Sequence, residues 1–246
     1  MELSLTRLAG TESSERLLVV GPSLGTSVDQ LWRACAQVLG PEVEVIGWDL
    51  PGHGHGKPVG EAFTVADLAD EVSARTVALA NGRPTGYAGV SFGGAVGFEL
   101  ASRDQGPFDG VVTIGAARRI GTPQMWWDRA AVVRRAGTAV MVSGSAQRWF
   151  APGFVERSPD VAGGLLRALV EVDDESYARA CEALAGFEAG AAVTPVRVLM
   201  GEHDVVVPLD GADLVLAGCG HLPPAEAPEL VARVLLEEMR CPTTTA

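Results

Sequence analysis

The chain has 246 residues, of which 47% are apolar and 20% are charged, and its net charge is −12. This composition supports a sizeable buried core and excludes a disordered chain. The acidic balance argues against nucleic acid or an anionic membrane surface as the main partner. No run approaches the roughly 20 apolar residues of a membrane span, and the first residues lack the pattern of a secretion signal. We therefore expect a soluble, cytoplasmic protein.

The four cysteines are scattered and form no C-x-x-C pair; they are Cys35, Cys181, Cys219 and Cys241. In a chain of this length, such spacing predicts reduced thiols that act as small buried apolar residues. The pattern indicates neither a disulfide framework nor a metal site.

Short apolar runs alternate with helical patterns over the first 117 residues. The runs predict strands at residues 16–20, 43–48, 85–90 and 111–114. Helical spacing and capping residues predict helices at residues 27–39, 64–80 and 92–102. Because such alternation favours parallel pairing with helices on both faces, the sequence predicts an α/β fold with a mostly parallel sheet flanked by helices.

The rhythm changes between residues 119 and 187, where amphipathic helical stretches replace strands. The sheet pattern resumes at 193–200 and 213–216, and a last helix is expected at 226–240. We therefore predict a core of residues 1–118 and 188–246 with an inserted helical cap at 119–187. The insertion holds eight arginines and eight acidic residues. A neutral, arginine-bearing cap on an acidic body would let a small anion approach, although ordinary variation in surface charge explains the counts equally well.

One serine stands at a junction that suits a nucleophile. Gly89-Val90-Ser91-Phe92-Gly93 matches G-x-S-x-G, the pattern of a nucleophile elbow, with a predicted strand before it and a predicted helix after it. The small neighbours let the strand and the helix approach each other, so the serine occupies a sharp turn. The Phe92 N–H at the start of the helix is then a candidate donor to a developing oxyanion.

A serine nucleophile needs a histidine base and an acid that orients it. The four histidines are His53, His55, His203 and His221. Hydrolases with this elbow carry the residues in the order Ser, Asp or Glu, His, and Asp204 and His221 satisfy that order after Ser91. Glu202 is a competing acid. Each residue also has a plain alternative, with Asp204 capping its loop and His221 serving as a structural loop residue, and His53 is expected to order its own glycine-rich loop.

A second oxyanion donor is expected in the loop after the first predicted strand. Residues 21–27 read GPSLGTS, and their small side chains let the backbone fold under a substrate. The N–H of Leu24 is the candidate donor. A plain strand-to-helix turn is the alternative interpretation.

Together these stretches resemble those of the α/β-hydrolases over nearly the whole chain. The resemblance rests on 49–54 (DLPGHG), the serine elbow, 201–204 (GEHD) and Gly220-His221. More narrowly, the chain is similar to the 3-oxoadipate enol-lactonases of aromatic catabolism in three stretches: 23–26 (SLGT), 120–122 (IGT) leading into Trp127, and 148–150 (RWF). This resemblance implies hydrolysis of a small enol-lactone that carries a carboxylate, giving a 3-oxo diacid without a cofactor.

The sequence departs from the enol-lactonase pattern at two places. Pro22 stands where those proteins commonly carry Asn, so the entrance to the oxyanion loop is expected to differ. His221 follows Asp204 by only 17 residues, which is about ten fewer than the resemblance implies. Because a parallel crossover normally needs roughly a dozen residues, usually with a helix, the sequence predicts that this helix is missing and leaves the position of the last strand open.

The resemblance also suggests substrate contacts from the cap and the first loop. Ser23, Trp127 and Trp149 are expected to border the acyl pocket, and Arg134 or Arg148 to meet a substrate carboxylate through two parallel N–H bonds. The alternatives are tryptophans that seal the cap onto the core and arginines that are solvated.

The sequence therefore favours a serine hydrolase that opens a small anionic lactone or ester, with neither metal nor cofactor and with Ser91, His221 and Asp204 as catalytic residues. A general carboxylesterase or perhydrolase of the same fold is one alternative. A non-catalytic small-molecule binder with a degraded triad is another, and a homo-oligomer is left open.

Overall fold

The structure, a computed structural model, describes residues 2–240. Cys241, one of the four predicted thiols, lies outside these residues, and the other three cysteines are free and buried.

Seven strands form one sheet: β1 (Ser4–Ala9), β2 (Arg16–Gly21), β3 (Val43–Asp49), β4 (Thr85–Val90), β5 (Gly110–Ile114), β6 (Val196–Gly201) and β7 (Leu214–Leu216). Their order is β1-β3-β2-β4-β5-β6-β7, and every neighbouring pair is parallel except β1 with β3. The predicted fold class is confirmed.

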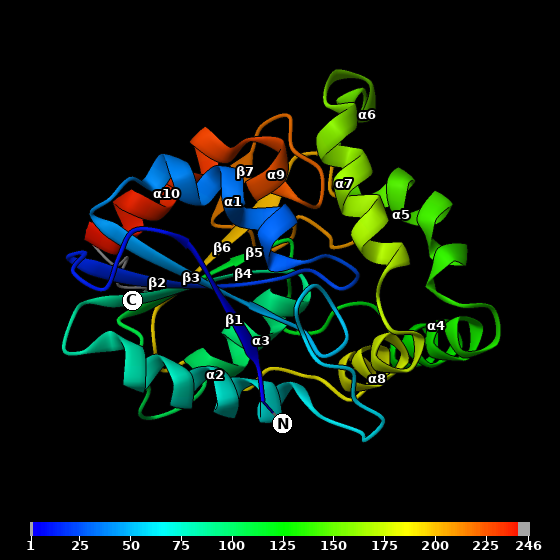
Figure 1. Ribbon diagram of the computed structural model, residues 1–246, viewed down its shortest axis with the longest axis horizontal. Helices are drawn as coiled ribbons and strands as arrows, with labels where there is room; N and C mark the ends of the chain where they lie inside the picture. Colours follow the sequence, from blue (N-terminus) through cyan, green and yellow to red (C-terminus); the bar gives the residue numbers. More distant parts are fainter. Residues whose placement is uncertain (1, 241–246) are drawn as a thin grey trace.

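Helices cover both faces of the sheet, as Figure 1 shows. One face carries α1 (Val28–Leu39), α9 (Pro223–Glu226) and α10 (Pro228–Arg240), and the other carries α2 (Val65–Ala80) and α3 (Phe92–Ala101). The helices start where capping residues place them: the Ser27 side chain accepts the Gln30 N–H, and Thr64 forms a capping box with Asp67. The core lies between these layers, and its fully buried large side chains include Trp32, Trp48 and Phe92.

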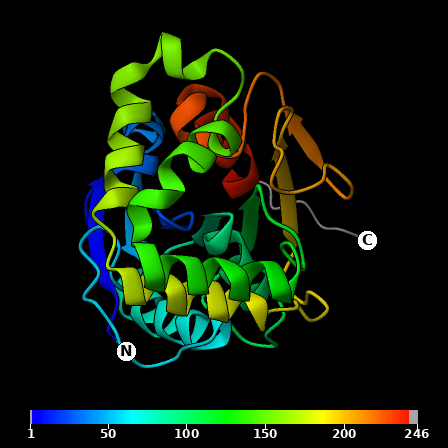
Figure 2. The same ribbon diagram turned by 90° about the vertical axis from the view of Figure 1, so that its right-hand side faces the viewer.

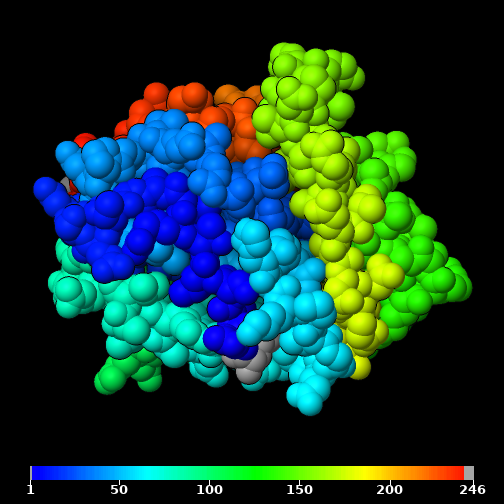
Figure 3. Space-filling model, in the orientation of Figure 1, coloured from blue at the N-terminus to red at the C-terminus, as the bar shows by residue number. Residues whose placement is uncertain are grey.

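The segment between β5 and β6 is helical and forms a cap at one side of the sheet (Figures 1 and 2). It consists of α4 (Pro123–Ala136), the 3₁₀ helix η1 (Thr138–Met141), α5 (Val142–Trp149), α6 (Phe154–Arg157), α7 (Pro159–Val170) and α8 (Asp174–Ala185). Helices α4 and α8 lie side by side. In the space-filling view of Figure 3, part of the cap forms a continuous column against the core. These helices occupy the interval that the sequence assigns to a cap.

Some elements differ from the expectations. Strand β1 was not predicted, because it is a half-exposed edge strand in which few side chains are buried. Strand β6 begins at Val196 rather than Val193. The last helix, α10, begins at Pro228 rather than Glu226, and the separate short helix α9 precedes it.

The short crossover between β6 and β7 contains turns and no helix, as the sequence predicts. Strand β7 nevertheless pairs in parallel with β6, with Leu214 opposite Leu199. Asp213 closes the connection, because its carboxylate accepts the Val198 N–H at 2.7 Å and its own N–H donates to the Val198 carbonyl at 2.9 Å. The last strand therefore keeps its place beside β6 without the helix. No helix among residues 2–240 has the length and apolar character needed to cross a membrane.

Candidate active site

The loops that follow β2, β4, β5, β6 and β7 meet beneath the cap around a cavity of about 130 Å³. Its sheet side includes Ser23, Leu24, Ser91, Val205, Val206 and His221. Its cap side includes Met125, Trp126, Arg129, Arg148, Trp149 and Tyr177. This is the carboxyl-terminal edge of a parallel sheet, where α/β proteins bind their ligands.

The turn at Ser91 has the strained backbone of an elbow. Ser91 has φ 52° and ψ −107°, a conformation that non-glycine residues rarely adopt. The flanking glycines are sterically required: a Cβ at Gly89 would lie 2.2 Å from the Gly93 carbonyl oxygen, and one at Gly93 would lie 2.6 Å from the Gly21 carbonyl carbon. The Ser91 N–H donates to the Ile114 carbonyl at 2.8 Å. Strand, turn and helix are thus packed so closely that the side chain of Ser91 is held at the cavity.

Asp204 and His221 form a buried pair. The Nδ1 atom of His221 lies 2.8 Å from Oδ2 of Asp204, while Oδ1 accepts the N–H groups of Val206 and Val207 at 2.7 and 3.1 Å. Burial by itself raises the pKa of Asp204, but the hydrogen bonds from His221 and the two backbone groups outweigh it and lower that pKa below its ordinary value. An ionised Asp204 favours a proton on Nδ1, which leaves Nε2 as the ring's acceptor.

The short 204–221 connection brings this pair together through backbone contacts between its two ends. The His203 N–H donates to the Cys219 carbonyl at 2.8 Å, so the loop after β6 is joined to the loop after β7. Glu202, the competing acid, is exposed and accepts the Gly218 N–H at 2.8 Å instead of contacting His221. The geometry therefore favours Asp204 as the partner of the histidine.

Gly115 is a site residue that sequence reasoning missed. It follows β5 with φ +55°, and a Cβ there would lie 3.0 Å from both Asp204 Oδ2 and His221 Nδ1. The absent side chain leaves room for the pair. The available signal was a lone glycine directly after the apolar run of residues 111–114.

The two predicted oxyanion donors lie near Ser91 with free N–H groups. Phe92 is the first residue of α3, so its N–H has no acceptor within the helix. Leu24 lines the cavity, and its N–H has no acceptor among residues 2–240. The loop that carries Leu24 is held to the helix start because the Gly93 N–H donates to the Pro22 carbonyl at 2.8 Å. The bond uses only the carbonyl of residue 22, so a proline can stand there.

On the cap, the structure corrects two of the expected contacts. Arg148 and Trp149 line the cavity as expected. Trp127 does not line it: its side chain points outward and is 49% exposed, and its neighbour Trp126 is buried in the cavity wall instead. Arg134 does not line it either, because its guanidinium is paired with acidic residues of α8. Helix phase explains both corrections, since a shift of one residue turns a helical side chain by about 100°.

Arg129 is the cationic side chain that sequence reasoning missed. It lines the cavity, and its guanidinium carbon lies 4.7 Å from the centroid of the Trp126 ring, in a cation–π contact. Within the described chain, neither Arg129 nor Arg148 forms an ion pair with a carboxylate. Burial lowers the pKa of Arg148, and the nearby charge of Arg129 lowers it further. Two uncompensated guanidinium groups therefore face one cavity of an acidic protein.

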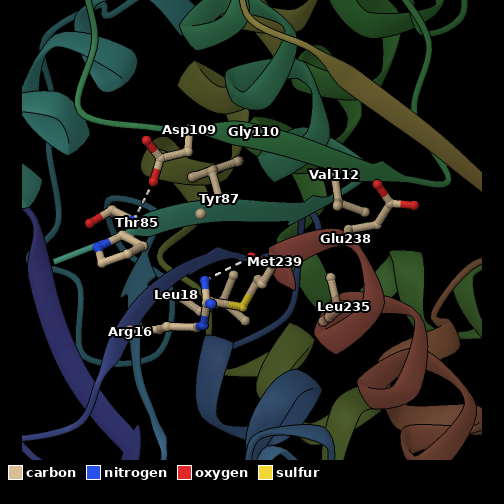
Figure 4. A pocket seen from close by; sticks show the side chains of 12 residues that line it. Arg16, Leu18, Thr85, Tyr87, Asp109, Gly110, Val112, Leu235, Glu238 and Met239 are labelled. Atoms are coloured by element: carbon tan, nitrogen blue, oxygen red, sulfur yellow. Dashed lines mark hydrogen bonds between the residues drawn. The ribbon is translucent and has the colours of Figure 1, made fainter. Parts of the chain in front are cut away.

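A smaller hollow of about 40 Å³ lies at the opposite ends of the same strands, under the end of α10 (Figure 4). Arg16 there donates to the Met239 carbonyl at 2.8 Å, and the Thr85 N–H donates to the Asp109 carboxylate at 2.8 Å. These bonds occupy polar groups of the hollow, and its lining contains neither Ser91 nor His221. Among the described residues, no group of three His, Cys, Asp or Glu side chains could hold a metal ion.

Known proteins resemble this chain in sequence and in fold. The chain is similar to 3-oxoadipate enol-lactonase 2 of Acinetobacter baylyi, with 33% identity over 211 residues that cover 83% of this chain and 76% of the relative. The solved enol-lactonase from Burkholderia xenovorans LB400 superposes with a TM-score of 0.87 at 26% identity, covering 97% of this chain and 96% of that one. A thermophilic esterase from Thermogutta terrifontis shares the fold, with a TM-score of 0.86 at 22% identity over 97% of this chain and 93% of its own. Residues 17–234 match the alpha/beta hydrolase family, and the chain therefore belongs to that family.

Proposed function

We propose that this protein is a serine hydrolase that opens a small enol-lactone carrying a carboxylate. One observation carries the proposal: a single cavity contains a strained serine, a histidine paired with a buried aspartate, and two arginines without acidic partners. The serine and histidine supply the chemistry of acyl transfer, and the arginines supply the selectivity for an anion.

In the proposed reaction, Ser91 Oγ attacks the lactone carbonyl while Nε2 of His221 takes its proton. The oxyanion that forms accepts hydrogen bonds from the N–H groups of Leu24 and Phe92. Ring opening breaks the bond between the acyl carbon and the enol oxygen, and His221 returns the proton to that oxygen. A water molecule then attacks the acyl-enzyme with His221 again as base, releasing the acid and restoring Ser91. The enol tautomerises to the ketone.

Asp204 has a distinct part in both half-reactions. Its carboxylate holds the proton on Nδ1 of His221 and stabilises the imidazolium that forms twice in each turnover. Its lowered pKa keeps it ionised through the neutral pH range.

The arginines support the choice of an anionic substrate. A guanidinium forms two parallel hydrogen bonds with a carboxylate, and Arg129 and Arg148 are available for such bonds because acidic residues do not occupy them. The similarity to enol-lactonases of Acinetobacter baylyi and Burkholderia xenovorans supports the same substrate class.

The test compares a carboxylated enol-lactone with p-nitrophenyl acetate, an uncharged ester of similar size. We expect kcat/KM for the lactone to exceed that for the ester by roughly 10- to 100-fold, as one charge-assisted contact of about 1.5–3 kcal/mol implies. Equal values would reject the lactone assignment and favour a general carboxylesterase. Failure of a fluorophosphonate to label Ser91 would instead favour a binding protein.

A further inference from the structure

A carboxylate near the Asp204–His221 pair takes no part in the proposed reaction. Glu226, the last residue of α9, accepts three backbone hydrogen bonds. Its Oε1 atom accepts the N–H of Gly220 at 3.0 Å and that of Leu222 at 3.2 Å, which are the residues on either side of His221. Its Oε2 atom accepts the N–H of Ala151 in the cap at 2.7 Å.

The cap contacts the histidine loop at two further points. The N–H of His221 itself donates to the carbonyl of Trp149 at 2.9 Å. Gly220 lets the two backbones approach, because a Cβ there would lie 2.6 Å from the Ala151 nitrogen and 2.9 Å from the Trp149 oxygen. Glu226, Gly220 and cap residues 149–151 thus form one bonded unit around His221, which we call the clamp.

We propose that Glu226 is a positioning residue. By holding the cap at Ala151 against the residues on either side of His221, it keeps the imidazole directed toward Ser91. The proposal rests on the proposed function in one respect, that His221 is the base for Ser91. The clamp fixes the backbone of three successive residues, 220–222, and so limits the directions in which the imidazole can point. Trp149 belongs both to the clamp and to the cavity wall, so a ligand that displaces the wall also displaces the histidine.

A carboxylate suits this place because all three of its partners are donors. Two oxygens without hydrogens can accept the three N–H groups, whereas an amide would direct an NH₂ group at one side of the clamp. Burial raises the pKa of Glu226, and the backbone hydrogen bonds oppose that rise. Glu226→Gln therefore breaks one side of the clamp while changing the size of the side chain very little.

The matched control is Glu202→Gln. Glu202 also accepts a backbone N–H of the same loop, from Gly218 at 2.8 Å, but it is exposed and contacts neither the cap nor a neighbour of His221. Three quantities are measured for each variant: the rate at which a fluorophosphonate labels Ser91, kcat and KM for p-nitrophenyl acetate, and the midpoint of thermal unfolding. None of these depends on which lactone the enzyme prefers.

For Glu226→Gln we expect the labelling rate and kcat to fall roughly 10- to 100-fold, as displacement of a catalytic group by about 1 Å implies. KM should stay within about twofold, and Glu202→Gln should match the wild type within about twofold. Gly220→Ala keeps Glu226 but places a methyl group against cap residues 149–151. It should likewise lower the labelling rate and kcat with little change in KM, and it replaces Glu226→Gln as the test if that variant does not fold.

The outcomes separate the two proposals. A labelled wild type with an equally labelled Glu226→Gln overturns the clamp alone. Losses that follow only the unfolded fraction and recover on cooling also overturn it, because they indicate a purely structural role. An unlabelled wild type overturns the clamp and the proposed function together, while labelling without any preference for the lactone rejects the substrate assignment and leaves the clamp standing.

Discussion

The two walls of the cavity are organised in different ways. On the sheet wall, backbone geometry sets each position: Ser91 occupies a strained turn, and glycines let adjacent segments approach. On the cap wall, helix phase decides which side chains reach the cavity. Arg129 faces it from α4, while Arg134 on the same helix turns toward Glu175 and Glu182.

This difference indicates a division of labour. Backbone strain and close packing allow few substitutions on the sheet wall. This is expected of residues whose atoms must be positioned for a chemical reaction. The cap wall is made of long side chains on helices, where single exchanges alter what binds. Substitutions on the sheet wall should therefore change kcat, and substitutions on the cap wall should change KM for charged substrates.

The largest expected effect is on the sheet wall. Ser91→Ala should lower turnover by up to roughly 10⁶-fold with the fold retained, because the proposed nucleophile is lost. Ser145→Ala removes the hydroxyl of a buried serine on the cap side of the same cavity and should cost less than about tenfold. Steady-state rates and circular dichroism measure both variants. Similar losses in the two would remove the distinction between the walls.

Next in size is Gly115→Ala. The new methyl group would press on both Asp204 Oδ2 and His221 Nδ1, so we expect kcat to fall roughly 10²-fold. Gly211→Ala is the control: it has the same kind of positive φ, +80°, but open space around the Cβ position. Both variants should lose about 1–2 kcal/mol of stability from backbone strain, measured by urea unfolding. Normal kcat in Gly115→Ala would show that the pair tolerates displacement.

The cap wall should respond to charge. Arg129→Gln and Arg148→Gln should each raise KM for a carboxylated lactone roughly 10- to 100-fold, the worth of a charge-assisted hydrogen bond. For an uncharged ester, KM should stay within about threefold. Arg134→Gln is the control on the same helix as Arg129, and its guanidinium already has acidic partners. If Arg134→Gln raised KM equally, the substrate would be attracted by the overall positive charge of the cap helices and not bound by Arg129 and Arg148 in particular.

The last prediction concerns stability and not catalysis, at the junction of the two walls, where His53 of the core stacks on Tyr177 of the cap with ring centroids 6.0 Å apart. Burial lowers the pKa of His53 from its ordinary 6.5 to about 4. The unfolded chain therefore binds a proton more readily than the folded protein between these values, so stability is lost as the pH falls from about 6.5 to about 4. The loss should be about 3 kcal/mol.

Urea unfolding at pH 7 and at pH 4 measures this contribution. His53→Gln should be less stable than wild type at pH 7, and that difference should shrink by about 3 kcal/mol at pH 4. His55 is an exposed neighbour in the same loop. The difference in unfolding free energy between His55→Gln and wild type should be the same at both pH values. A constant difference between His53→Gln and wild type would mean that His53 titrates normally in the folded protein.

Sequence reasoning anticipated geometry where local chemistry determines position. The structure contains the strained turn at Ser91, which requires its glycines, and the contact between Asp204 and His221. Sequence reasoning did not identify Gly115, because the need for that glycine arises from two side chains far away in the chain that pack against it.

The cap shows the other limit. Trp126 and Trp127 are adjacent and chemically identical, and the tertiary packing of α4 determines which one is buried: Trp126 donates to the Ile120 carbonyl, while Trp127 is exposed. The same packing supplies the carboxylates that occupy Arg134, while Arg129 is left without one. A weakly patterned edge strand such as β1 was missed for a related reason, since its pairing with β3 depends on a partner about 40 residues away.

The short connection between β6 and β7 has a consequence for how such enzymes diversify. Asp204 and His221, the proposed acid and base, lie on one stretch of the chain. A His203–Cys219 bond joins its two ends, and Asp213 in its middle bonds to Val198 of β6. Between those bonds the loop reaches solvent at Gly211. Because lengthening a surface loop costs little entropy, residues inserted at Gly211 would leave the Asp204–His221 contact in place. The stretch thus provides a place where the chain can change in length without moving the pair.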